Sequence, residues 1–185
     1  MKKLILFLVF CFSSIFGKAH EANNAFFQII EKGHSVEIQA EFPWSIRSAL
    51  IQFNPSLENS SERKDFEKTF EDYIKVNLVL IDIHGDTMPF SGFSELPNNG
   101  HSHQNNYSIN YTGENLSQII NTILFNVYDS QVNYHTYQFD GSEKTFETNT
   151  VNTHFTIRKP SQNIFAWVVF VGLLLGLLLF WKRTK

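Results

Sequence analysis

The sequence has almost no cysteine: Cys11 is the only one among 185 residues. It lies in an apolar N-terminal run that we expect to be cleaved off, so the mature chain would contain no thiol. Disulfide bonds and thiol catalysis are therefore excluded for the mature protein. We expect its stability to come from an ordinary hydrophobic core, for which the chain is long enough.

Catalytic motifs are also missing. The sequence contains no G-x-S-x-G, H-E-x-x-H, P-loop or G-x-G-x-x-G pattern. Two pairs of carboxylates have suggestive spacing, Asp82 with Asp86 and Glu67 with Glu71. The first pair spans a strand end and a turn, and the second lies on the polar face of a helix, so neither predicts a cleft. We expect a protein that is not an enzyme.

Positive charge is scarce in the central part of the chain. Between His20 and Pro160 there are nine Lys and Arg residues against 18 Asp and Glu, a net charge of −9. The whole chain carries only −3, because both of its ends are basic. An acidic body does not favour nucleic acid or direct contact with anionic lipid.

The C-terminal region contains the longest apolar run. Residues 164–181 (IFAWVVFVGLLLGLLLFW) carry no charge and have an indole near each end. A helix of this length spans roughly 27 Å, close to the thickness of the bilayer hydrocarbon. The run predicts a transmembrane helix, followed by a basic tail at 182–185 that we expect on the cytoplasmic side.

The N-terminus has the pattern of a secretory signal peptide. Lys2 and Lys3 precede a short apolar run, and the small residues Gly17 and Ala19 stand before a cleavage point. We expect cleavage between Ala19 and His20. Cys11 does not predict lipidation, because Phe10 is too bulky for the position before a lipidated cysteine.

These segments predict a single-pass protein of the inner (cytoplasmic) membrane. Its parts would be a signal peptide at 1–19, a periplasmic domain at 20–158, a linker at 159–163, the membrane helix at 164–181 and the tail at 182–185. The expected partners would thus include the membrane and would not include nucleic acid.

The body of the chain predicts short β-strands. The clearest is His34–Phe42, where apolar residues alternate with Glu and Gln, and Lys32-Gly33 joins it to Ala25–Glu31 as a hairpin. Asp140-Gly141 predicts a second hairpin. The other expected strands are Val76–His84, Thr87–Phe93, Tyr107–Tyr111, Ile119–Tyr128, Tyr134–Phe139, Ser142–Thr148 and Thr153–Ile157.

One amphipathic helix is predicted over Glu62–Ile74, where Phe66, Phe70, Tyr73 and Ile74 recur at helical spacing. Trp44–Phe53 is compatible with a strand or with a short helical turn. The whole pattern favours a mainly β, immunoglobulin-like antiparallel β-sandwich with one helix.

Two parts of the sequence resemble known families. The expected mature start, AHEANNAFFQIIEKGHSVEIQAEFP, resembles the extracytoplasmic domain of hydrogenase/urease-accessory membrane proteins. That resemblance implies a functional context in which nickel or other transition metals are handled. A single anchor, however, replaces the multi-helix transport bundle of that family.

The later body is similar to a family of small uncharacterised exported bacterial proteins. The similarity lies in Phe70–Ile74 leading into VNLVLIDIHGD and in 121–124 leading to 129–133. It implies an immunoglobulin-like domain and brings no catalytic residues.

Histidines offer one candidate site. A mature N-terminal His20 would present an α-amino group and an imidazole, which together chelate copper(II) or nickel(II). His101 and His103 are two residues apart, so on an extended segment both would face the same ion. The sequence leaves two functions open: a non-enzymatic interaction module supporting another membrane protein, such as a metal transporter, or a copper- or nickel-binding periplasmic domain using His20.

Overall fold

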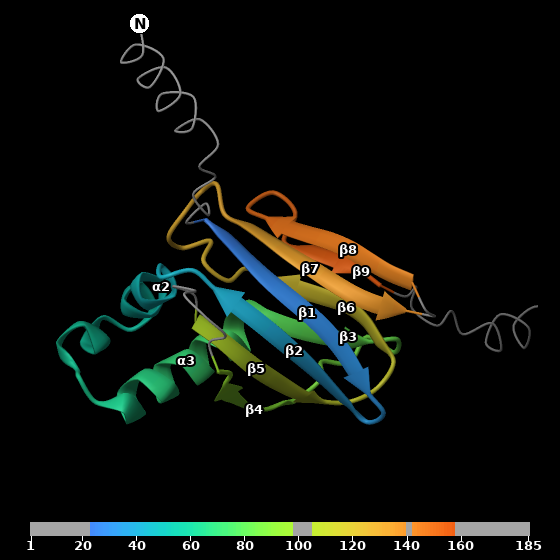
Figure 1. Ribbon diagram of the computed structural model, residues 1–185, viewed down its shortest axis with the longest axis horizontal. Coiled ribbons are helices and arrows are strands. Elements are labelled where there is room, and N and C mark those ends of the chain that lie inside the picture. The colour runs from blue at the N-terminus through green and yellow to red at the C-terminus, as the bar shows by residue number, and fades with distance from the viewer. Residues whose placement is uncertain (1–22, 98–104, 140–141, 158–185) are drawn as a thin grey trace, which may run out of the picture.

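The computed structural model describes residues 23–97, 105–139 and 142–157 (Figure 1). The signal peptide expected at 1–19, the linker, the membrane helix expected at 164–181 and the tail at 182–185 lie outside the described residues. Among the helices that are described, none has the length and apolar character required to cross a membrane.

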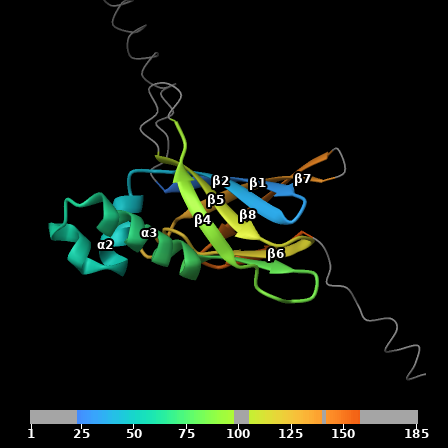
Figure 2. The same cartoon turned by 90° about the horizontal axis from the view of Figure 1, so that it is seen from below.

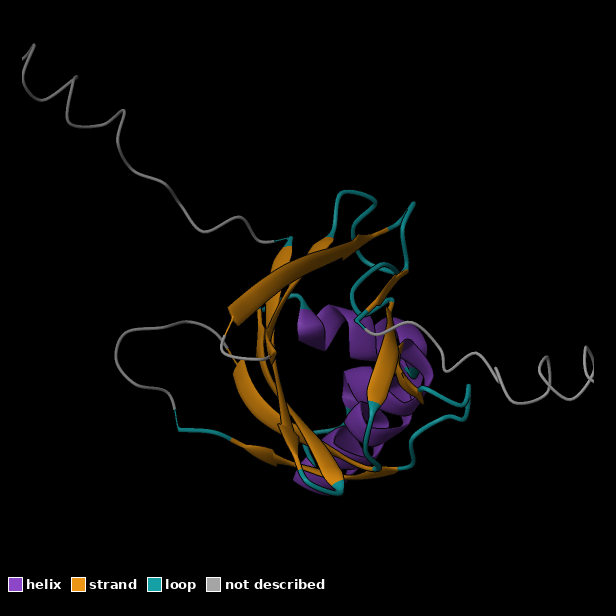
Figure 3. Ribbon diagram, turned by 90° about the vertical axis from the view of Figure 1, so that its right-hand side faces the viewer, coloured by secondary structure: helices purple, strands orange, loops and turns teal. Residues whose placement is uncertain are grey.

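The described chain is mainly β and forms two sheets. In spatial order the larger sheet contains β4 (Phe90–Glu95), β5 (Asn105–Thr112), β2 (Ser35–Phe42), β1 (Asn24–Lys32), β7 (Val132–Phe139) and β8 (Ser142–Asn149). The smaller sheet contains β3 (Leu78–Asp82), β6 (Leu116–Asn121) and β9 (His154–Thr156). Figure 3 shows the larger sheet curving around the interior with the smaller sheet across from it, as in a β-sandwich.

Both predicted hairpins pair as expected. β1 and β2 are antiparallel, with Ile29 opposite Ile38, and their inward side chains are buried whereas the intervening polar residues are not. β7 and β8 are also antiparallel; the turn at 140–141 lies outside the described residues. One pairing departs from the antiparallel expectation, because β1 and β7 run parallel within the larger sheet, with Phe26 opposite Tyr134.

Within the described residues, two α-helices, rather than one, lie together at one end of the sheets (Figure 2). α3 (Arg63–Asn77) is the predicted helix, extended at its C-terminal end. α2 (Ile46–Phe53) occupies the stretch for which strand and helix had both been compatible, and a 3-10 turn, η2 (Pro55–Asn59), joins the two. α2 buries Ile46, Ala49 and Leu50, whose spacing of three and four residues gives it a single apolar face.

Two strand predictions were wrong in extent. β6 ends at Asn121, because the side-chain Oδ1 of Asn121 accepts the backbone N–H of Ile123 and the chain turns there. Leu124 then adopts a φ of 68°, which no strand allows. After β3, Thr87 makes one bridge to Ile81, and the chain then crosses to pair as β4 with β5 of the other sheet.

The core lies between the two sheets and extends under the helices. Its largest fully buried side chains include Tyr73, Tyr111, Phe27, Phe42 and Phe70. The hydroxyl of Tyr111 on β5 donates a 2.7 Å hydrogen bond to the carbonyl of Leu78 on β3, so a polar contact joins the two sheets within the apolar interior. This packing leaves the opposite face of the larger sheet turned outward.

Candidate binding surface on the larger sheet

The metal ligands predicted from the sequence, His20, His101 and His103, all lie outside the described residues, so their geometry stays a prediction. His34, His84 and His154 are exposed, and His135 is buried. Within 23–97, 105–139 and 142–157, no three His, Cys, Asp or Glu side chains are grouped so that they could hold a metal ion.

The carboxylate pairs have local structural partners. Asp82 accepts backbone hydrogen bonds from His84 and Asp86, at 2.7 and 3.0 Å, and so closes the turn after β3. The bond from the Asp86 N–H is the main cause of the lowered pKa of Asp82. On α3, Glu67 pairs with Arg63, and Glu71 pairs with Lys75.

The outward face of the larger sheet carries rows of polar side chains, which follow from the strand register. One row runs from β8 to β5 through Glu147, Tyr134, Phe26, Glu41 and Asn106. The next row contains Thr145, Thr136, Gln28, Gln39 and Ser108. Hydroxyl, amide and carboxylate groups therefore dominate this face, and an aromatic pair interrupts them.

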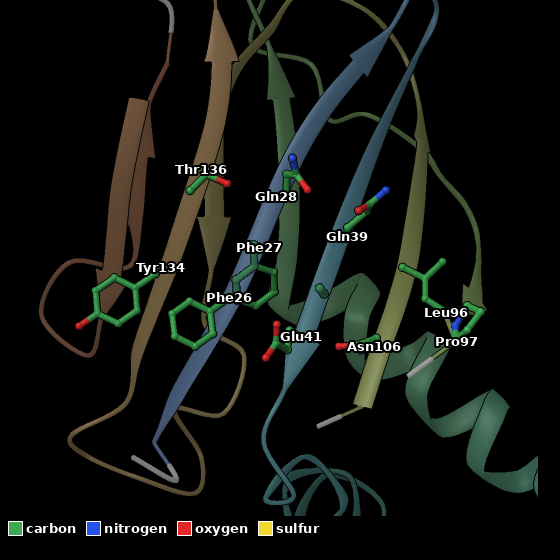
Figure 4. A pocket seen from close by; sticks show the side chains of 11 residues that line it. Phe26, Phe27, Gln28, Gln39, Glu41, Leu96, Pro97, Asn106, Tyr134 and Thr136 are labelled. Carbon is green, nitrogen blue, oxygen red and sulfur yellow. The ribbon is translucent and has the colours of Figure 1, made fainter. Parts of the chain in front are cut away.

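A hollow of about 440 Å³ lies on this outward face. Figure 4 shows that its side chains come from several strands of the larger sheet and from the segment that follows β4. Its lining residues are Phe26, Phe27, Gln28, Gln39, Ala40, Glu41, Leu96, Pro97, Asn106, Tyr134 and Thr136. We call this feature the outer-face hollow.

Two rings form the apolar part of the outer-face hollow. Phe26 and Tyr134 are stacked with their centroids 5.6 Å apart and an interplanar angle of 18°. Phe26 stays 40% exposed, although the next residue, Phe27, is 2% exposed on the other side of the same strand. Figure 4 shows the two rings side by side, with Glu41 next to Phe26. A partly exposed aromatic pair beside polar groups is typical of a contact surface.

The two glutamates of β2 that face outward differ in their surroundings. Glu37 pairs with Lys32 and accepts hydrogen bonds from Ser108 and Gln39, and the bond from Lys32 is the main cause of its lowered pKa. Glu41 lines the hollow and takes part in none of the ion pairs of the described residues. One carboxylate is thus neutralised by a neighbouring lysine, and the other has no ion-pair partner in the part of the chain that the structure describes.

A second polar cluster lies inside the sandwich. Gln131, Asn133, His135, Asn121 and Thr148 are all between 0% and 1% exposed. Gln131 Nε2 donates to Asn133 Oδ1, and Asn133 Nδ2 donates to Asn121 Oδ1 and to the carbonyl of Ile123. These bonds connect β7 to the turn that follows β6. Because all of its members are buried and bonded to one another or packed within the core, we interpret the cluster as structural.

His135 is held neutral in this interior. Its ring stacks on Phe27 at 5.0 Å and contacts Phe155 at 4.6 Å. Burial lowers its pKa to about 3, and the nearby backbone of Phe146 and Asn133 offsets only part of that effect. In the described chain, three buried polar atoms have no hydrogen-bond partner: His135 Nδ1, Gln131 Oε1 and Thr148 Oγ1.

Sequence reasoning missed both polar features. The hollow draws on β1, β2, β5 and β7, and the pairs β1–β7 and β2–β5 join strands that are far apart in sequence. For the interior cluster a signal was present. Asn133, His135 and Tyr137 stand two residues apart, which places all three on the same face of β7, and Tyr137 belongs to the core. Gln131, directly before the strand, continues the same spacing.

No protein-family model matches the chain, and a comparison with curated proteins gives no significant match. The two resemblances given above therefore stay predictions. The geometry of the outward face is the observation from which a function can be proposed.

Proposed function

We propose that this protein is a membrane-anchored extracytoplasmic interaction module, without enzymatic activity, that supports another membrane protein. In this proposal the domain is an immunoglobulin-like sandwich, anchored by residues 164–181 to the inner membrane and facing the periplasm. The resemblance of the mature start to hydrogenase/urease-accessory proteins favours a metal transporter as the partner.

One observation carries the proposal: the outer-face hollow combines the partly exposed Phe26–Tyr134 pair with the carboxylate of Glu41, which forms no ion pair with any described residue. An exposed aromatic side chain gains apolar contact when a partner covers it. The polar side chains around it would hydrogen-bond to that partner, as the rim of an interface does.

Photocrosslinking in native membranes tests this function. A photoreactive amino acid is placed at Thr136, which lines the hollow, or at Lys64, which lies exposed on α3. We expect the Thr136 variant to capture one defined membrane protein, identified by mass spectrometry, and the Lys64 variant to capture it at least tenfold less. Equal capture at both positions, or a solitary protein at both, would refute the proposal.

The second candidate function is a copper or nickel site at the mature N-terminus, and the position of His20 directly after the expected cleavage point favours it. The test is a copper(II) titration of protein that begins at His20. Submicromolar binding that one added N-terminal residue abolishes would support a site at His20. Weak binding that does not depend on the terminus would remove it.

A further inference from the structure

The outer-face hollow has a charge that nothing in its lining balances. Of the eleven lining residues, Glu41 is the only charged one. Its Cα partners across the sheet are Phe26 on β1 and Asn106 on β5, so an aromatic ring and an amide flank it. A carboxylate in this position attracts a cation, because none of the described residues that line the hollow carries a positive charge.

Glu37 lies on the same face of the same strand, and neighbouring side chains already meet the charge and the hydrogen bonds of its carboxylate. Lys32 neutralises Glu37, and Ser108 and Gln39 complete its hydrogen bonds. A carboxylate with these partners is a poor candidate for binding a ligand. Glu41 has no equivalent of Lys32 among the described residues, although it belongs to the same strand and the same outward face.

The aromatic pair adds a second element of cation recognition. The ring of Phe26 lies next to Glu41 and is 40% exposed. Tyr134, on the neighbouring strand β7, stacks on it and enlarges the aromatic surface. An ammonium or guanidinium group binds favourably over such a ring, and the aliphatic stem of Lys or Arg packs against it.

Charge around the hollow acts in the same direction. Glu147 lies beside Tyr134 in the same row of the outward face. The segment from His20 to Pro160 carries a net charge of −9. An acidic surface of this kind raises the rate at which a basic partner associates and disfavours an acidic one.

Building on the function proposed above, we infer that the outer-face hollow binds an arginine or lysine side chain presented by the partner protein. The Glu41 carboxylate pairs with the cationic group, and the Phe26–Tyr134 pair contacts the stem or the plane of the side chain. The amides of Gln28 and Gln39 provide hydrogen-bond acceptors beside it. A neutral oligosaccharide would also suit amides and rings, but the unpaired carboxylate favours the cation.

The test measures peptide binding to the full chain purified in detergent. The probe is a labelled heptapeptide in which Arg alternates with Gly, and its counterpart has Gln in place of each Arg. We expect the Arg peptide to bind at least tenfold more tightly than the Gln peptide. Its affinity should fall at least tenfold in Glu41→Gln and several-fold in Phe26→Ala.

Glu143→Gln is the matched control, since it removes the same charge from the same sheet face outside the hollow. We expect it to change the affinity less than twofold, and the thermal midpoints of both Gln variants should equal that of the wild type. Equal losses in the two Gln variants would overturn the inference, because they would indicate unspecific attraction. It would also be overturned if N-acetylglucosamine tetramer or cellotetraose bound equally well to wild type and Glu41→Gln while the Arg peptide did not bind.

Failure of this inference is distinguishable from failure of the proposed function. Position-specific crosslinking from Thr136, combined with Arg-peptide binding that does not depend on Glu41, would refute the cation site and leave the interaction module standing. Loss of position-specific crosslinking would remove the function on which the inference rests.

Discussion

The side-chain nitrogen Nδ2 of Asn121 lies 2.9 Å from Nε2 of His135 in the interior between the two sheets. The Oδ1 of the same amide accepts the N–H of Ile123, and this orientation leaves Nδ2 as the donor to the imidazole. Nε2 must therefore be an acceptor, so His135 is neutral with its proton on Nδ1. One hydrogen bond thus determines both the charge and the tautomer of a buried histidine.

Acid should destabilise the fold through His135. Its pKa is about 3 in the folded protein and about 6.5 when unfolded, so only the unfolded chain takes up the proton as the pH falls through that interval. The free energy of unfolding should drop by up to about 1.4 kcal/mol per pH unit from this residue alone. Denaturant unfolding at pH 7 and pH 5 measures the drop.

His135→Phe should remove this part of the pH dependence while keeping the ring contacts to Phe27 and Phe155. His154→Asn is the control, because His154 is exposed. The assignment fails if the pH dependence of wild type and His135→Phe is the same.

Asn133→Ala should destabilise the fold by about 2–3 kcal/mol, because buried partners would lose their hydrogen bonds. Asn133 Nδ2 donates to Asn121 Oδ1 at 3.2 Å and to the carbonyl of Ile123 at 3.0 Å. Asn152→Ala, at an exposed position, should stay within about 0.5 kcal/mol of the wild type. Similar unfolding midpoints for the two variants would show that the interior cluster contributes nothing to stability.

Tyr73→Phe should loosen the turn that follows β6. The Tyr73 hydroxyl accepts the N–H of Leu124 at 2.8 Å and donates to Asn126 Oδ1 at 3.0 Å, and burial raises its pKa to about 12. Removing the hydroxyl should cost about 1–3 kcal/mol and speed amide exchange at Leu124. Unchanged exchange at Leu124 would mean that the hydroxyl does not hold the turn.

Local patterns accounted for the elements that depend on near neighbours. The alternation of Val36 and Glu37 predicted β2, and the helical spacing of Phe70 and Ile74 predicted α3, since burial on one face imposes those periods. Both hairpins followed from their turns. The sequence left open whether α2 would be a helix or a strand. With eight residues and three buried positions, the segment is too short for a helical period to exclude a strand.

Long-range pairing was the part that local patterns could not supply. The parallel contact of β1 with β7 joins Asn24 to Val132, and no turn signal links segments so far apart. That contact places Tyr134 beside Phe26 and so creates the aromatic part of the hollow. Since the hollow depends on register across four strands, its residues could be recognised only in the folded chain.

The most direct test of the central claim compares two phenylalanines of nearly equal exposure. Phe26 is 40% exposed in the outer-face hollow, and Phe53 is 42% exposed at the end of α2. Each is changed to Ala in the full chain, and the yield of the partner co-purified from native membranes is measured. We predict that Phe26→Ala lowers the yield at least tenfold while Phe53→Ala keeps it within twofold of the wild type. Equal yields from the two variants would contradict a binding role for the outward face of the larger sheet.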